Sequence, residues 1–247
     1  MTKIDPLILA VTTIDNNAHK AFEKFSPYAN DHCHVVIAHQ ATSKLITPIV
    51  IDIPNVTYIY HTSKGLSKNR NRILSHIHHG IYVVCDDDVE LKAWFEESIR
   101  QGFKNSWVQV LTYQTETPEG TLRKKYPKHR SCHNMITILW TSSIEIAFDI
   151  DAIKKKGIRF DEEFWLWTSN PYGEENIFLK DCLDAGLSIS YIPEVVTIHQ
   201  SHSSWTNRVL KEKIPLFRKM YWLFTGTIVL IWVTLKKFFG NTLIQRK

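Results

Sequence analysis

Four short apolar or β-branched runs near the N-terminus limit the folds that this chain can adopt. They lie at residues 7–11, 34–38, 56–60 and 81–84. Runs of this length are typical of strands that are buried on both faces. Between them, residues 18–26 predict a weak helix, and residues 66–77 predict a stronger one that is capped by Ser67 and ended by Gly80. Strands that alternate with helices favour an α/β fold with a largely parallel sheet and helices on both faces.

The rest of the chain predicts a mixed arrangement around a long polar loop. We expect helices at residues 90–103 and 175–185, and strands at residues 107–113, 144–148, 189–192 and 195–199. Residues 114–132, which contain two prolines and a glycine, predict a basic and polar loop. A loop of this length is usually functional or disordered.

The composition supports one large folded domain with a basic appendage. Of the 247 residues, 44% are apolar and 22% are charged, which is typical of a globular chain. We place the domain at residues 1–206 and the appendage at residues 207–247. From Arg208 to Lys247, nine Lys and Arg residues accompany one acidic residue, Glu212, so the positive net charge belongs to the tail. A nucleic-acid binder would normally carry this charge on its folded body, so we expect no nucleic acid partner.

The tail also contains an uncharged segment, residues 220–235, between two pairs of basic residues. As a helix this segment would extend about 24 Å, against about 30 Å of hydrocarbon in a bilayer. The length therefore does not favour a transmembrane span. We favour attachment of residues 208–239 to an anionic membrane surface, while a buried packing helix, a homo-oligomer contact and a true span remain open.

The cysteines and the N-terminus predict a cytoplasmic protein. The four cysteines have no CxxC spacing, which is typical of a reducing compartment. The first residues have neither the basic nor the apolar segment of a signal peptide. We therefore expect a cytoplasmic protein that binds peripherally to the inner face of the cell membrane.

Three carboxylates, Asp86, Asp87 and Asp88, lie where the apolar run at residues 81–84 ends. In open α/β sheets, ligands bind at the carboxyl ends of the strands. Adjacent carboxylates repel one another and favour a cation, and Mg²⁺ and Mn²⁺ prefer oxygen ligands completed by water and substrate phosphates. The alternative is that Asp88 caps the next helix while the other two carboxylates are solvated.

A basic cluster precedes this strand in the sequence. Lys64, Lys68, Arg70 and Arg72 lie at the start of the helix predicted at residues 66–77, where the helix amides also favour anions. Cations for phosphate next to carboxylates for a metal would hold a metal-bridged diphosphate. The alternative is a solvated basic helix face.

A third candidate site is formed by Glu174 and Glu175, at the start of the helix predicted at residues 175–185. A carboxylate in partly apolar surroundings can have its pKa raised toward the working pH, which suits a general base. The alternative is that both are first-turn residues favoured by the helix dipole. Further along the chain, His199 at the end of a predicted strand is either a metal ligand or a core histidine.

Taken in order, these motifs resemble those of glycosyltransferase family 2, whose members have the GT-A fold. The resemblance spans roughly residues 7–202. It rests on the Thr-rich end of the first strand and on GLSKNRN, CDDD, AFDI, GIRFDEEFW and GEENIFLKDCLDAGLSISYIPEVVTIH. It implies a GT-A-like, Rossmann-like α/β fold with a mixed, mostly parallel sheet flanked by helices. The basic and apolar tail would be a helical appendage to this fold.

The resemblance also implies roles for individual residues. Asp86, Asp88 and His199 would hold Mn²⁺ or Mg²⁺, and Glu175, with Glu174 beside it, would be the catalytic base. The residues expected to bind the sugar nucleotide are Thr12, Thr13, Lys68, Arg70, Asn71, Asp86 and Asp87.

Two positions depart from the family pattern. Residues 38–40, Ala-His-Gln, stand where members often have an Asp that recognises the nucleobase. Glu175 replaces the more usual Asp, which lengthens the base by one methylene group.

The implied reaction is a metal-dependent, inverting transfer of a sugar from a UDP- or GDP-type donor. The acceptor would be a hydroxyl of a glycan or of a lipid-linked molecule, in the synthesis of a bacterial surface polysaccharide or glycolipid. Arg123, Lys124 and Lys125 in the 114–132 loop would close over donor or acceptor. Two alternatives remain open: a nucleotidyltransferase, which would not need Glu175 as a base, and a non-catalytic sugar-nucleotide or glycan-binding module with the same fold.

Overall fold

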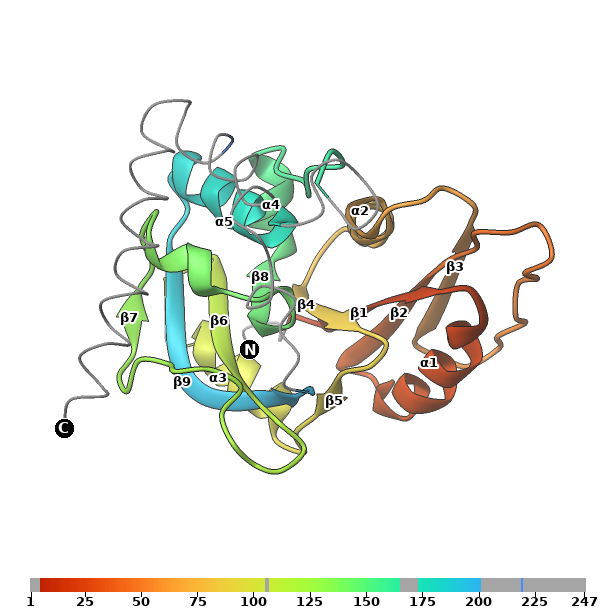
Figure 1. Ribbon diagram of the computed structural model, residues 1–247, viewed down its shortest axis with the longest axis horizontal. Coiled ribbons are helices and arrows are strands. Elements are labelled where there is room, and N and C mark those ends of the chain that lie inside the picture. Colours follow the sequence, from red (N-terminus) through yellow and green to blue (C-terminus); the bar gives the residue numbers. More distant parts are fainter. Residues whose placement is uncertain (1–4, 105–106, 165–172, 201–218, 220–247) are drawn as a thin grey trace, which may run out of the picture. The chain divides into compact units, whose positions relative to one another are not determined.

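The computed structural model of the chain describes residues 5–104, 107–164 and 173–200, together with Lys219. The chain forms two compact units, residues 1–162 with 174–202 and residues 163–173 with 203–247. The first unit contains the sheet and nearly all of the described residues (Figure 1). Apart from Lys219, the segment expected at the membrane surface lies outside the described residues.

Four parallel strands form the first half of the sheet, as the apolar runs predict. They are β1 (Leu7–Ile14), β2 (Cys33–Gln40), β3 (Val56–His61) and β4 (Ile81–Asp86). Their order across the sheet is β3-β2-β1-β4. Strands β1, β2 and β4 are buried along almost their whole length, which explains their continuous apolar sequences.

Two helices connect these strands. They are α1 (Ala18–Phe25), which lies between the 3-10 turns η1 (Asp15–Asn17) and η2 (Ser26–Tyr28), and α2 (Leu66–His76). The predicted cap of α2 is wrong. Gly65, with a φ of 139°, is the N-cap residue, and Ser67 lies buried inside the first turn. A backbone with this φ favours glycine, so the helix begins directly after the glycine that can adopt this conformation.

The second half of the sheet is mixed. The antiparallel neighbour of β4 is β8 (Ile146–Asp149), followed by β6 (Val110–Glu116), also antiparallel, and by β9 (Ile189–Ile198), which runs parallel to β6. Two short strands, β5 (Glu90–Leu91) and β7 (Ser131–Cys132), pair antiparallel with β9, which curves along this half in Figure 1. The remaining elements are the helices α3 (Phe95–Lys104), α4 (Ile150–Lys155) and α5 (Glu174–Asp184), and the 3-10 turns η3 (Thr137–Trp140) and η4 (Ser143–Glu145).

Several predicted boundaries in this half are wrong. The helix expected at residues 90–103 begins only at Phe95, because residues 90–91 pair with the distant strand β9. No helix starts directly after Asp88, because the next element is the strand β5, so Asp88 is not a helix cap. The strand expected at residues 107–113 lies at 110–116, and the two strands expected at 189–192 and 195–199 form the single strand β9.

One apolar core joins the two halves of the sheet. It includes Leu9 of β1, Val83 of β4, Leu111 of β6 and Val196 of β9. All four cysteines are free, and three of them are buried. Within the described residues, no helix combines the length and the apolar character needed to cross a membrane.

Candidate active site

Polar side chains replace apolar ones where β1 and β4 end. Thr12 of β1 lies beside Asp86 of β4 in the parallel register, and Thr13 and Asp87 follow them. The chain passes from β1 to β2 on one side, whereas β4 lies on the other side of β1. In open α/β sheets, ligands bind beyond the carboxyl ends of the strands at such a reversal of strand order. The carboxylates therefore lie where this fold places a ligand.

Arg70 joins two parts of the site that are far apart in the sequence. Its Nη2 donates to Asp86 Oδ1 at 3.0 Å, and its Nη1 donates to Glu174 Oε1 at 2.9 Å. Thr12 Oγ1 also donates to Asp86 Oδ1, at 3.0 Å. Arg70 thus connects the carboxylate cluster at the end of β4 to the start of α5, where the candidate base lies.

The side chain of Arg70 is completely buried. Its guanidinium carbon lies 5.5 Å from the centroid of the Phe160 ring. Burial acts to lower the pKa of Arg70, but the charges of Asp86 and Glu174 outweigh it and raise the pKa above its usual value. Both Nη groups are used by carboxylates of the chain itself. The Nε has no hydrogen-bond partner in the described residues, but the side chain is 0% exposed, so this geometry suits a positioning residue better than a phosphate ligand.

The second carboxylate, Asp87, is turned toward β1. Thr13 Oγ1 donates to Asp87 Oδ2 at 2.6 Å. Burial raises the pKa of Asp87, although the hydrogen bond from Thr13 opposes this effect. Thr12 and Thr13 therefore orient two of the three carboxylates.

The third carboxylate, Asp88, contacts His199 at the end of β9. His199 Nε2 lies 3.1 Å from Asp88 Oδ2, and its Nδ1 lies 2.8 Å from the carbonyl oxygen of Gln200. Both partners are acceptors, so both ring nitrogens must donate, which requires the doubly protonated imidazolium. The hydrogen bond to Asp88 correspondingly raises the pKa of His199, and the same bond lowers the pKa of Asp88.

The pair of Asp88 and His199 also fits a divalent cation. Ligand atoms at about 2.1 Å from an octahedral ion lie about 3 Å apart, close to the observed separation of 3.1 Å. With a cation there, Nε2 would be a lone-pair donor and Nδ1 would keep its proton for Gln200. Asp86 does not complete a three-residue metal site with this pair. Within the described residues, no three His, Cys, Asp or Glu side chains form a group that could hold a metal ion. Asp86 Oδ2 has no hydrogen-bond partner in the described part of the chain.

The two glutamates at the start of α5 differ in their surroundings. Glu174 is buried, and its carboxylate is paired with the guanidinium of Arg70. Glu175 is partly exposed. Desolvation by the surrounding protein raises the pKa of Glu175 well above its usual value, and the negative charge of Glu174 raises it further. A carboxyl group with a raised pKa and some exposure suits proton transfer with a ligand.

Comparison with known proteins identifies the fold. No family model matches the chain, and no curated protein matches it. Among solved structures, the chain is similar to residues 1–349 of TarS from S. aureus, with a TM-score of 0.62 and 15% identity over 87% of this chain and 64% of that one. The same fragment in complex with UDP-GlcNAc gives a TM-score of 0.63 and 14% identity over 87% and 65%. TarS is a glycosyltransferase of the GT-A type. The chain has the GT-A fold.

The chain spans slightly less than two thirds of the TarS fragment and 39% of a longer TarS structure. A further structure of the fragment in complex with UDP has a TM-score of 0.61. The predicted fold class is confirmed.

The asparagines that flank Arg70 tie this GT-A fold together. Asn69 Nδ2 donates to the carbonyl oxygens of Thr13 and Ala38, and its Oδ1 lies 2.8 Å from His61 Nε2. It therefore links the ends of β1, β2 and β3. Asn71 exchanges hydrogen bonds with the backbone of Phe160. Sequence analysis did not select Asn69, although a buried asparagine in a helix beside strand ends is the available signal.

Other predicted residues lie outside this network. Lys68 is partly exposed, and it contrasts with the three buried residues that follow it. At the end of β2, where members often have the Asp that recognises the nucleobase, Gln40 Oε1 accepts from the backbone N–H of Gly65 at 2.6 Å. His39 is buried beside Tyr58, and burial lowers its pKa. Gln40 thus supports the start of α2 from within the protein.

The 114–132 loop is held by a buried carboxylate that sequence analysis missed. Glu145 is 3% exposed and accepts hydrogen bonds from Lys124 Nζ at 2.8 Å and from the Tyr126 hydroxyl at 2.7 Å. Lys124 also donates to the carbonyl oxygen of Trp140. Lys124 is therefore a structural cation, because its charge is matched inside the fold.

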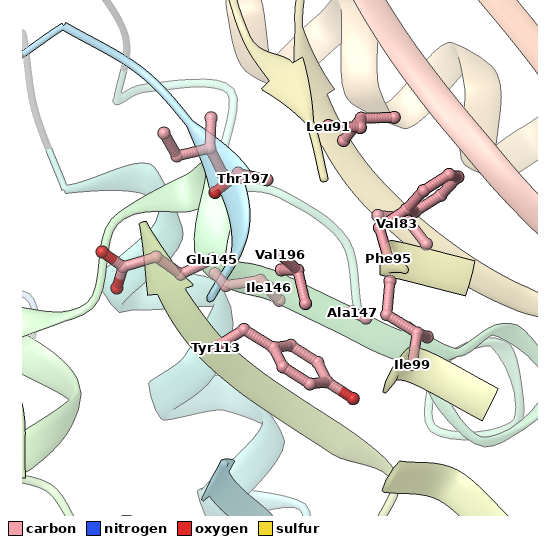
Figure 2. Close-up of a pocket in the computed structure, with 11 residues that line it drawn as sticks. Val83, Leu91, Phe95, Ile99, Tyr113, Glu145, Ile146, Ala147, Val196 and Thr197 are labelled. Carbon is pink, nitrogen blue, oxygen red and sulfur yellow. The ribbon is translucent and has the colours of Figure 1, made fainter. Parts of the chain in front are cut away.

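An apolar cavity lies in the core of this GT-A fold (Figure 2). Its volume is about 10 Å³, and its lining includes Val83, Phe95 and Tyr113. The carboxylate of Glu145 points away from it in Figure 2. Such a volume holds about one water molecule at most, so the cavity is a packing void and not a sugar site.

Proposed function

We propose that the protein is a glycosyltransferase that moves a sugar from a nucleoside-diphosphate sugar to a hydroxyl acceptor. The observation that carries this proposal is Arg70, which is buried between Asp86 at the strand reversal and Glu174 beside the candidate base. A donor site and a base are thereby fixed relative to each other, as a transfer between two bound substrates requires. The likeness to a fold that binds UDP-GlcNAc in TarS supports a UDP-type donor.

In the proposed inverting reaction, Glu175 accepts the proton of the acceptor hydroxyl while the oxygen of that hydroxyl attacks the anomeric carbon. The new carbon–oxygen bond forms as the bond from the anomeric carbon to the diphosphate breaks, and the nucleoside diphosphate leaves with the bonding electrons. Asp88 and His199 would hold Mn²⁺ or Mg²⁺, and Asp86, whose Oδ2 has no hydrogen-bond partner in the described residues, would be available as a further oxygen ligand. This ion would neutralise the negative charge that develops on the diphosphate.

The acceptor we propose is a hydroxyl of a glycan or of a lipid-linked molecule in the synthesis of a surface polysaccharide or glycolipid. The support for this is the basic and apolar tail at residues 208–239, whose composition suits an anionic membrane surface.

The test of this function begins with a thermal-shift screen of UDP, GDP and their sugars, with and without Mn²⁺. We expect one donor to raise the melting temperature in a metal-dependent manner. Glu175→Gln should keep this stabilisation but lose about 10²- to 10⁴-fold in turnover with an acceptor, because an amide cannot accept the proton.

The matched control is Glu97→Gln on the exposed face of α3, which should leave binding and turnover unchanged. Full turnover by Glu175→Gln would favour a nucleotidyltransferase. Donor binding without turnover in the wild type would favour a binding module, and the absence of any nucleotide binding would exclude the proposed function.

A further inference from the structure

Arg123 is a partly buried cation at the edge of the candidate active site, and it has no side-chain partner in the part of the chain that the structure describes. Its Nε is buried and has no hydrogen-bond partner, and its guanidinium forms no ion pair within the described residues. A partly buried, unpaired charge is costly for a folded chain. Such a group is therefore expected where it meets a ligand of opposite charge.

The strand pairing places Arg123 on the same face of the sheet as His199. The backbone N–H of Arg123 donates to the carbonyl oxygen of Thr115, and Thr115 pairs on its other side with Thr197 of β9. Directly opposed residues project from the same face, which the 2.7 Å contact between the hydroxyls of Thr115 and Thr197 confirms. His199 follows Thr197 by two residues and projects from that face as well.

Two carboxylates on elements that contact the segment of Arg123 are already used. Glu116 follows Thr115 in β6 and is paired with Lys92. Glu145 is occupied by Lys124 and Tyr126. Within the described residues, the protein therefore supplies a counter-charge for the neighbouring Lys124 but none for Arg123.

We propose that Arg123 binds a phosphate oxygen of the nucleoside diphosphate, next to Asp88 and His199. This inference rests on the proposed function and names a donor-binding residue within it. A guanidinium matches the geometry of phosphate and cannot lose its charge at working pH. Of the three basic residues in the 114–132 loop, the structure selects Arg123 for this role.

The experiment compares Arg123→Gln, Lys125→Gln and the wild type by calorimetric titration with UDP or GDP, whichever binds the wild type, and with the matching nucleoside. Arg123→Gln should weaken binding of the diphosphate about ten- to a hundredfold, since hydrogen bonds to charged groups are worth about 1.5–3 kcal/mol. Binding of the nucleoside should stay within twofold. Lys125 is exposed in the same loop, and its substitution should leave both affinities unchanged.

Thermal unfolding without ligand gives a second, independent readout. Arg123→Gln should leave the melting temperature unchanged or raise it, whereas Lys124→Gln should lower it, because Lys124 is the partner of buried Glu145. Equal diphosphate affinity in Arg123→Gln and the wild type would overturn the inference and leave the proposed function standing. A fall in melting temperature as large as that of Lys124→Gln would also overturn it. If the wild type binds no nucleoside diphosphate, both proposals fail.

Discussion

Two groups of polar residues meet at the candidate active site, and they differ in how well the protein satisfies them. The buried framework consists of Asn69, Arg70 and Asn71. The partly exposed rim consists of Asp88, Arg123, Glu175 and His199. Framework side chains bond to several distant elements, whereas the rim groups either lack a partner or have one that a ligand can replace.

This difference indicates which residues build the site and which act on ligands. A polar group that is buried and bonded to several elements of the protein fixes geometry but has little capacity left for a substrate. A rim group that keeps exposure and an unsatisfied charge lowers stability in the free protein and is compensated when ligand binds. Substitutions in the framework should therefore reduce stability, and substitutions in the rim should reduce ligand binding.

The largest effect is expected for Arg70→Met in the framework. Removing this guanidinium leaves Asp86 and Glu174 without their shared counter-charge inside the protein. Loss of one partner from a buried ion pair typically costs about 3–5 kcal/mol. Denaturant unfolding monitored by circular dichroism should show a decrease of this size in the free energy of unfolding.

The control for this prediction is Arg72→Met, two residues further along α2. Arg72 is exposed, so its substitution should change the free energy of unfolding by less than about 0.5 kcal/mol. If Arg70→Met changed the free energy of unfolding as little as Arg72→Met, the framework would not depend on the ion pairs of Arg70. That result would contradict the distinction between framework and rim.

A smaller effect on stability is expected for His199→Gln in the rim. Asp88 is exposed over 65% of its side chain, and an ion pair at such a position contributes less than about 1 kcal/mol. The larger expected effect concerns ligand binding. In the presence of Mn²⁺, the apparent affinity for the nucleotide should be at least tenfold lower in His199→Gln than in the wild type. Calorimetric titration with and without Mn²⁺ measures this difference.

His78→Gln is the matched control, because His78 is exposed on the segment after α2. It should leave both stability and metal-dependent binding unchanged. If His199→Gln instead lowered the free energy of unfolding strongly and kept the full metal dependence of nucleotide binding, His199 would belong to the framework and not to the rim.

The sequence predicts the carboxylate cluster well, because its position depends on local patterns. Buried strands are recognisable from continuous apolar runs, and polar residues after them fall at the same edge of a parallel sheet. Thr12 and Asp86 meet for this reason, although 74 residues separate them.

The framework and the loop contacts are harder to predict, because they depend on pairings between distant segments. Nothing in the sequence near Arg70 indicates that Glu174 will be its partner. Likewise, the sequence does not distinguish the roles of Arg123 and Lys124, because only the fold shows that Glu145 pairs with Lys124. The helix expected to begin at Glu90 fails in the same way, since pairing with β9 overrides the local preference.

The smallest predicted effect lies at the opposite edge of the sheet, at the amino ends of β1 and β4. There His79 bridges Asp5 and Asp151, with its Nε2 2.9 Å from Asp5 and its Nδ1 2.5 Å from Asp151. As with His199, both ring nitrogens face acceptors, but His79 lies far from the strand ends that carry the carboxylate cluster. The hydrogen bond to Asp151 is the main cause that raises the pKa of His79.

Because the folded-state pKa is raised, His79 contributes stability that is fully present below its unfolded pKa of about 6.5 and is lost as the pH rises through the folded value. The side chain is 48% exposed, so this contribution should be under about 1 kcal/mol. We expect wild type and His79→Gln to differ in free energy of unfolding at pH 5.5 and to converge at pH 8.5, with nucleotide binding equal in both. A difference that persists at pH 8.5 would show that His79 acts through packing and not through its charge. Loss of nucleotide binding would show that the two edges of the sheet are coupled.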